Sequence, residues 1–146
     1  MKPGLQPSQG RLLIVEDDDP TRFALAKILT IKGYEVVTAA TVQAALVKCE
    51  DHDCLLLDLH LPDGLGLEVL KRMRQKCRNA RIAICSAAYD PALRDRVEEY
   101  QPDAVFIKPI DLDALLAWVA RVCSKEQEAA PHQQAGGDSA SSSPNA

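Results

Sequence analysis

The chain has 146 residues, a formal net charge of −4 and a hydrophobic content of 47%, values that are ordinary for a folded globular domain. The acidic balance argues against nucleic acid as the main partner, and no apolar stretch is long enough to suggest a membrane span. The N-terminus lacks the apolar core of a signal peptide, and the five cysteines include no C-x-x-C pair. We therefore expect reduced thiols and a cytoplasmic location.

Short apolar segments alternate with helical patterns along the chain. The segments with the length and composition of buried strands are 11–15, 34–39, 54–57, 81–85 and 104–107. Helices are expected from 20 to 33, from 42 to 49, over 65–73, from 91 to about 100, and from 112 to 122. Strands that alternate with helices predict a parallel sheet.

Most of the expected helices have a recognisable start and an apolar face. The expected N-cap residues are Asp19, Thr41, Asp90 and Asp111. The expected buried faces are Phe23, Leu25, Ala26, Ile28 and Leu29 in the first helix, and Leu112, Leu115, Leu116, Trp118, Val119 and Val122 in the last. The third helix is expected to turn Lys71, Arg72 and Arg74 outward.

These elements predict an α/β fold with a five-stranded, doubly wound parallel sheet. Right-handed crossovers leave few topologies, and the flavodoxin-like order 2-1-3-4-5 is the common one for five strands. This order places the first and third strands side by side. We expect the domain to cover residues 11–124, between a disordered segment at 1–10 and a disordered tail at 125–146 that is rich in serine, alanine, glycine and glutamine.

Polar side chains follow four of the predicted strands at the point where each strand ends. They are Glu16 and Asp17 after the first strand, Asp58 after the third, Ser86 after the fourth and Lys108 after the fifth. Each one alone is ordinary, since acids after a strand often belong to a solvated loop. Together they lie at the carboxyl ends of parallel strands, where open α/β sheets bind their ligands. The two acidic strand ends predict a site for a hard divalent cation.

This combination resembles the receiver domain of two-component response regulators, the CheY-like superfamily. The matching segments are Ile-Val-Glu-Asp-Asp at 14–18, Asp-Leu-His-Leu-Pro-Asp-Gly-Leu-Gly at 58–66, Ile-Cys-Ser-Ala at 84–87 and Phe-Ile-Lys-Pro at 106–109. All four occur in the order of the family, and the resemblance covers about residues 11–123. It implies a phosphoacceptor aspartate and a bound magnesium ion.

The resemblance assigns a metal role to the acidic residues. Asp58 would be the phosphoacceptor, because a carboxylate can act as a nucleophile and form an aspartyl phosphate. Asp17 and Asp58 would bind Mg²⁺ directly, while Glu16 would act through a water molecule. The backbone carbonyl of His60 would complete the protein ligands. The ion would neutralise charge that develops on the phosphoryl group.

The remaining polar groups would contact the phosphoryl oxygens. The resemblance implies that Lys108 supplies a positive charge, that Ser86 donates a hydrogen bond, and that the small Ala87 leaves room. The His60 side chain would tune the lifetime of the acyl phosphate. The expected donor is a sensor histidine kinase or a histidine phosphotransfer protein, and the expected receiver of the signal is a protein target or an output domain. Only self-phosphorylation and autodephosphorylation are expected as activities.

Two positions depart from the pattern of the family. The aromatic residue that often stands three places before the lysine is replaced by Val105, and Phe106 follows one place later. Strand alternation would point these two side chains to opposite faces of the sheet. Gln101-Pro102 stands where Gly-Ala is frequent, which predicts a stiffer loop before the fifth strand.

Three alternatives stay open at this point. Residues 17–21 also satisfy the D-x-D-x-T pattern of haloacid-dehalogenase-type phosphatases, in which Asp17 would be the nucleophile and Asp19 the general acid. A receiver-like interaction module that is never phosphorylated is a second alternative. We expect a single-domain response regulator; the third alternative is that the chain is a piece of a hybrid kinase or of a regulator with an output domain.

Overall fold

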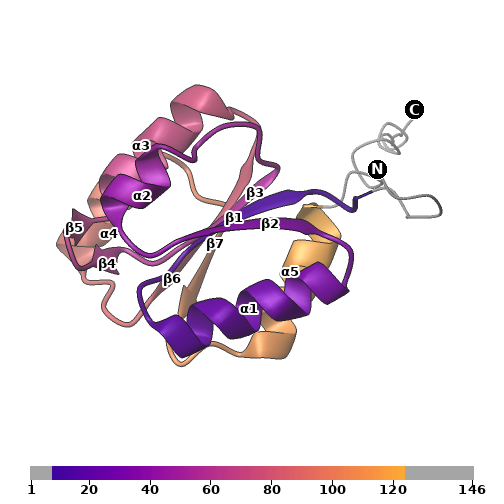
Figure 1. The fold of residues 1–146 in the computed structure, drawn as a ribbon. Helices are drawn as coiled ribbons and strands as arrows, with labels where there is room; N and C mark the ends of the chain where they lie inside the picture. Colours follow the sequence, from indigo (N-terminus) through magenta and orange to yellow (C-terminus); the bar gives the residue numbers. More distant parts are fainter. Residues whose placement is uncertain (1–7, 124–146) are drawn as a thin grey trace, which may run out of the picture.

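The computed structural model describes residues 8–123, so the predictions for 1–7 and 124–146, including the tail, lie outside the described residues. One parallel sheet lies at the centre of the molecule (Figure 1). Its strands are β1 (Arg11–Val15), β2 (Glu35–Ala39), β3 (Cys54–Leu57), β6 (Arg81–Ser86) and β7 (Ala104–Ile107). Their order is β2-β1-β3-β6-β7, which confirms the predicted flavodoxin-like order.

Helices cover both faces of the sheet, as expected for a doubly wound fold. The helices are α1 (Asp19–Ile31), α2 (Val42–Leu46), α3 (Leu67–Lys76), α4 (Pro91–Glu98) and α5 (Leu112–Val122). In Figure 1, α1 and α5 lie on one face of the sheet, and α2, α3 and α4 lie on the other. Within residues 8–123, no helix is both long enough and apolar enough to cross a lipid bilayer.

The central strands are buried on both faces, which explains their continuous apolar runs. In β1, Leu13 and Val15 pack into the cluster under α2, α3 and α4, while Leu12 and Ile14 pack into the cluster under α1 and α5. All four residues of β3 are buried in the same alternating way. Burial of each such side chain stabilises the fold by about 1.5–3 kcal/mol.

The first helix begins one residue earlier than predicted, and its cap is Asp18 rather than Asp19. Asp18 has an extended backbone, and its side chain accepts a hydrogen bond from the N–H of Thr21 at 3.1 Å. Asp19 is instead in the first turn, where it pairs with Arg22 at 2.6 Å. Adjacent aspartates offer the same chemistry, so composition cannot separate them. The predicted caps of the α2, α4 and α5 helices are confirmed.

Several predicted side-chain orientations are wrong. Phe23 is 63% exposed and lies under the guanidinium of Arg22 at 4.9 Å from the ring centroid, outside the buried face of α1. Leu112 is also exposed at the start of α5. Arg74 is half-buried, because its guanidinium hydrogen-bonds to main-chain carbonyls such as that of Ala80 at 2.7 Å. Helical spacing predicts which face of the helix a side chain lies on. It does not predict which other segments that side chain contacts.

Several element boundaries also differ from the prediction, among them the end of α2 and the start of α3. The α2 helix ends at Leu46, before Cys49, which is nevertheless buried. The α3 helix starts at Leu67, because two short strands precede it: β4 (His60–Leu61) pairs antiparallel with β5 (Gly64–Leu65). Two-residue strands carry no periodicity, so the sequence could not predict them.

The residues just before β1 are part of the fold, which corrects the expectation of disorder at 8–10. The N–H of Gln9 donates to the Gly33 carbonyl at 2.9 Å, and the N–H of Glu35 donates to the Gly10 carbonyl at 2.8 Å. Gly10 has φ of +156°, and a Cβ there would lie 2.5 Å from the Cys123 carbonyl oxygen. Glycine is therefore required where this segment passes the end of α5.

Candidate functional site

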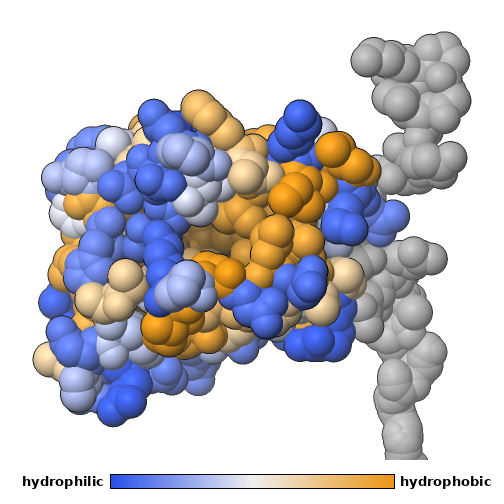
Figure 2. Space-filling model, turned by 90° about the horizontal axis from the view of Figure 1, so that it is seen from below, coloured by the Kyte–Doolittle hydropathy of each residue, from blue (hydrophilic) through white to orange (hydrophobic). Residues whose placement is uncertain are grey.

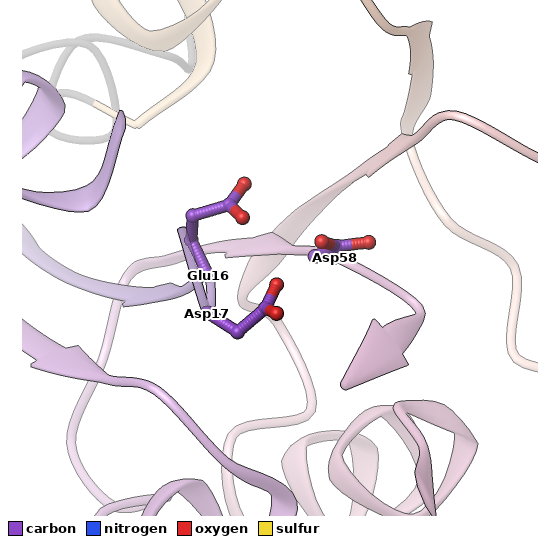
Figure 3. Close-up of side chains that lie close together, drawn as sticks. All are labelled: Glu16, Asp17 and Asp58. Carbon is purple, nitrogen blue, oxygen red and sulfur yellow. The ribbon is translucent and has the colours of Figure 1, made fainter. Parts of the chain in front are cut away.

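Three carboxylates meet at the carboxyl ends of two neighbouring strands. Val15 and Leu57 pair in the parallel ladder of β1 and β3, so the residues after them emerge at the same level. One oxygen each from Glu16, Asp17 and Asp58 lies within 4.8 Å of the others, and Figure 3 shows the three side chains grouped around a shared space. The predicted acidic cluster is therefore present.

The cluster combines buried and exposed acids with one cation. Glu16 is 4% exposed and Asp58 is 6% exposed, while Asp17 is exposed to solvent. The ammonium of Lys108 donates to Oε1 of Glu16 at 2.7 Å and to Oδ2 of Asp58 at 3.0 Å. Three carboxylates thus lie close together, and a single ammonium pairs with two of them. The site keeps an excess of negative charge that a cation can neutralise.

Burial and hydrogen bonds in this cluster shift the pKa of two of its members. Burial raises the pKa of Glu16 above its ordinary value, and the hydrogen bond from Lys108 offsets this only in part. Burial also opposes the charge on Lys108, but its hydrogen bonds to Glu16 and Asp58 outweigh that effect and raise the pKa of Lys108. The lysine therefore stays charged at neutral pH.

Main-chain hydrogen bonds fix the acidic groups in place. The N–H of Asp18 donates to Oε2 of Glu16 at 3.1 Å, and the N–H of His60 donates to Oδ1 of Asp58 at 3.2 Å. The guanidinium of Arg22 donates to the Glu16 carbonyl at 2.9 Å. Sequence reasoning missed Arg22, although its i,i+3 spacing from Asp19 was a signal that it lies over the start of α1.

A glycine allows the chain to pass close behind Asp58. A Cβ on Gly66 would lie 2.8 Å from the Asp58 carbonyl oxygen and 3.1 Å from a methyl group of Leu57. The N–H of Gly66 donates to the Leu59 carbonyl at 2.7 Å, which closes the short β4–β5 hairpin. The Gly64 and Gly66 spacing in the sequence fits this hairpin, though its role was not predicted.

Ser86 reaches the site through the backbone rather than through its side chain. It is fully buried at the end of β6, and its carbonyl accepts the N–H of Lys108 at 2.9 Å. Its hydroxyl donates to the Ala88 carbonyl at 2.9 Å and accepts from the Ala88 N–H at 3.3 Å. The carboxylates and Lys108 are therefore joined directly, while Ser86 lies beside them with its hydroxyl turned to the β6–α4 loop.

Phe106 and Val105 point to opposite sides of the sheet, as strand alternation predicted. Phe106 packs in the cluster under α5, where its ring meets Trp118 edge to face with centroids 6.2 Å apart. Val105 is partly exposed on the other side, at 36%. No aromatic ring from this strand therefore lies next to α4 among the described residues.

An apolar hollow of about 560 Å³ opens next to the cluster. Figure 2 views the α1 and α5 face, where apolar residues surround a recess. Its lining includes apolar side chains of both helices, such as Leu25, Ile28 and Leu115, together with Glu16 and Lys108. The other two carboxylates do not line it. The hollow is thus a neighbour of the acidic cluster and separate from the approach to Asp58.

A model of the response regulator receiver domain family matches residues 12–120 of this chain. The match spans all four strand ends that carry the polar groups. This chain belongs to the response regulator receiver domain family. It is a receiver domain of two-component signalling, in which the role of the domain is that of a phosphoacceptor. The phosphatase and the non-phosphorylated module are not favoured.

The receiver domain is similar to parts of larger regulators. It is 32% identical over 104 residues to a cyclic di-GMP phosphodiesterase of Thermotoga maritima, and 32% identical over 126 residues to the transcriptional regulatory protein KdpE of Mycobacterium tuberculosis. These matches cover 71% and 84% of this chain. The chain spans only 28% and 55% of the two relatives.

The receiver domain also resembles solved structures over nearly their whole length. A CheY-like response regulator receiver domain protein from Methanospirillum hungatei superposes with a TM-score of 0.75 and 28% sequence identity. The superposition covers 85% of this chain and 98% of that one. The similarity extends through the sheet and its flanking helices, so it supports the predicted fold as a whole.

Proposed function

We propose that Asp58 is the phosphoacceptor of this receiver domain and that Mg²⁺ binds at Glu16, Asp17 and Asp58. The observation that carries the proposal is the position of Asp58. Glu16 and Asp58 both contact Lys108 and lie in the same cluster, but only Asp58 follows β3, the strand between β1 and β6. Asp58 therefore lies between the acids after β1 and Ser86 at the end of β6. Among the described residues, Lys108 pairs with Glu16 and Asp58 but not with Asp17, and Asp17 is exposed, which suits a metal ligand better than a nucleophile.

The donor set fits a magnesium ion. Mg²⁺ prefers oxygen ligands and keeps several waters, so one or two carboxylates are enough to hold it. The cluster offers three carboxylates within reach of one another, and one of them faces solvent. The His60 carbonyl, expected from the family pattern, would add a further oxygen. When bound, the ion would neutralise charge on the phosphoryl oxygens.

The transfer step uses residues that already surround Asp58. A carboxylate oxygen of Asp58 forms a bond to phosphorus while the P–N bond of a donor phosphohistidine breaks, and the imidazole nitrogen leaves with the electron pair. Lys108 keeps its charge and would contact a phosphoryl oxygen. The hydroxyl of Ser86 would turn from Ala88 to donate to another oxygen. Ala87, which is exposed, leaves space at this side.

The proposed partners follow from the donor chemistry. We propose a sensor histidine kinase or histidine phosphotransfer protein as donor, and a protein target or an output domain as the next element. The net charge of −4 does not favour direct nucleic-acid binding. All five cysteines are described, and all are free thiols, which fits a reducing cytoplasm.

Intact-mass measurement after incubation with acetyl phosphate tests the proposal. The wild-type chain should gain one phosphoryl group in Mg²⁺, and the gain should disappear in EDTA and in Asp58→Ala. Asp113→Ala is the matched control, since Asp113 is an exposed aspartate on α5 that, among the described residues, has no hydrogen bond or ion pair to the three carboxylates or Lys108. This variant should be phosphorylated like the wild type.

The other outcomes separate the alternatives. A wild-type chain that gains no mass would contradict the proposal. It would favour the alternative of a receiver-like interaction module that is not phosphorylated. A gain that survives Asp58→Ala but is lost in Asp17→Ala would assign the nucleophile to Asp17 instead. A gain that is equal with and without Mg²⁺ would contradict the metal part alone.

A further inference from the structure

The main-chain carbonyl of Ala88 joins two segments around the site. It lies 3.1 Å from Nε2 of His60 and 2.9 Å from the hydroxyl of Ser86. A carbonyl oxygen only accepts hydrogen bonds, so Nε2 of His60 carries a proton and the hydroxyl proton of Ser86 points at Ala88. One carbonyl in the β6–α4 loop is therefore held from both sides.

His60 connects this loop to the proposed phosphoacceptor. Its main-chain N–H donates to Oδ1 of Asp58 at 3.2 Å, while its imidazole reaches across 28 positions of the sequence to Ala88. His60 and Ala88 are both exposed, whereas Asp58 is buried. The imidazole thus connects two exposed segments, one that follows β3 and one that follows β6.

Phosphorylation would disturb this arrangement. The hydroxyl of Ser86 has one proton, which it cannot donate to Ala88 and to a phosphoryl oxygen at the same time. The Ser86 hydroxyl also accepts a hydrogen bond from the Ala88 N–H. When the hydroxyl turns to the phosphoryl group, this hydrogen bond is kept only if the β6–α4 loop moves with it. The His60 imidazole holds the same residue by its carbonyl. It therefore resists the movement that the switch of Ser86 favours.

We propose that His60 is a positioning residue that latches the β6–α4 loop in its unphosphorylated arrangement through the Ala88 carbonyl. The latch itself is a contact of the unphosphorylated chain. Its effect on phosphorylation rests on the proposed function of Asp58 and Ser86. Without the imidazole, the loop would follow Ser86 more easily, and the phosphorylated form would be favoured.

Amide hydrogen exchange at Ala88, measured by NMR on the unphosphorylated chain, tests the latch directly. Loss of one exposed hydrogen bond raises the equilibrium constant for local opening of the loop by about two- to five-fold. The Ala88 amide should therefore exchange faster by that factor in His60→Ala. His60→Gln keeps an N–H donor and should restore most of the protection. Leu65→Ala is the matched control, because Leu65 is the cross-strand partner of His60 in the β4–β5 ladder. It should leave Ala88 unchanged.

The second measurement is the phosphorylated fraction at steady state in acetyl phosphate and Mg²⁺. It should rise in His60→Ala and return toward the wild-type value in His60→Gln. Unchanged Ala88 exchange in His60→Ala, or faster exchange that His60→Gln fails to correct, would overturn the latch. A wild-type chain without any mass gain would overturn the proposed function instead, and the exchange data would still decide whether the latch exists.

Discussion

The two ends of the parallel sheet use charged residues in different ways. At the carboxyl end, Glu16 and Asp58 are buried close together and share Lys108. At the amino end, Asp53 accepts the N–H of Arg11 at 2.8 Å. In the same way, Asp103 there accepts the N–H of Ile82 at 2.8 Å. Asp53 and Asp103 accept hydrogen bonds from backbone N–H groups at the strand ends. The carboxylates at the carboxyl end lie close together and repel one another.

Arg74 extends the pattern of the amino end. Its guanidinium donates to the carbonyls of Tyr100, Ala80 and Gln101 at 2.8, 2.7 and 2.7 Å. Charged groups that satisfy backbone atoms contribute to stability, since unpaired buried carbonyls are costly. Carboxylates that lie close together keep a negative charge that can bind a cation. They contribute less to the stability of the fold. The comparison teaches that position on the sheet, rather than residue type, separates structural from functional charges.

The largest expected effect on stability is that of Arg74→Ala. The substitution removes the donor of three short hydrogen bonds and one longer one to main-chain carbonyls and should lower the free energy of unfolding by about 2 kcal/mol. Urea unfolding measures this loss. Lys76→Ala is the control, because Lys76 is exposed and pairs with Glu50 at only 3.5 Å, so its loss should cost less than about 0.5 kcal/mol.

Arg74→Ala should still be phosphorylated by acetyl phosphate, because its contacts lie at the opposite end of the sheet. The contrast between the two ends would fail if this variant kept its stability but lost phosphorylation. Equal losses of stability in Arg74→Ala and Lys76→Ala would show that the three carbonyl contacts contribute nothing beyond a surface ion pair.

A smaller effect of opposite sign is expected at the carboxyl end. Asp17→Asn removes one of three carboxylates that lie within 4.8 Å of one another. Because Asp17 is exposed, relief of the repulsion should raise the free energy of unfolding by only about 0.5 kcal/mol in EDTA. The same variant should lose most of the stabilisation that Mg²⁺ gives the wild type.

Urea unfolding in EDTA and in Mg²⁺ measures both parts of this prediction. Glu99→Gln serves as the control, since it removes one exposed negative charge at the end of α4. If Glu99→Gln raised stability as much as Asp17→Asn, the effect would belong to net charge. If Asp17→Asn lowered stability in EDTA, the carboxylates would not repel one another as their positions indicate.

The fold was predictable because its signals are local and repeated. β1 and β3 have apolar runs with acids at their ends, and their strand boundaries were predicted as the structure has them. The strand order followed from handedness and strand number. The acidic cluster could be predicted for the same reason, since parallel strands bring their ends to one edge. Whether Asp58 accepts a phosphoryl group stays a prediction.

What could not be predicted depends on contacts between distant side chains and backbone atoms. The bond of His60 to Ala88 and those of Arg74 to three carbonyls leave no periodic pattern in the sequence. Phe23 has the spacing of a buried residue, yet it is exposed. The buried face of α1 is narrower than the set of apolar residues that the sequence pattern assigned to it. Adjacent aspartates at the start of α1 were interchangeable by composition, so the cap was assigned one residue late.

The smallest expected effect is a pH dependence that originates at the amino end. His52 is 5% exposed, and its Nε2 lies 2.7 Å from the Lys48 carbonyl, while Nδ1 is buried without a hydrogen-bond partner among the described residues. Burial lowers the pKa of His52 below its ordinary value of 6.5, although the contact with Lys48 partly opposes this. The folded chain therefore favours the neutral imidazole.

The sign of the pH dependence follows from this shift. As the pH falls below 6.5, the unfolded chain binds a proton at His52 before the folded chain does, so stability decreases until the lower, folded pKa is passed. His52→Gln cannot titrate and should show a smaller loss between pH 7.5 and 5.5 in urea unfolding. An equal loss in the wild type and the variant would mean that His52 does not cause it. A smaller loss in the variant would show that the amino end, although it holds no proposed chemistry, still makes the stability of the fold depend on pH.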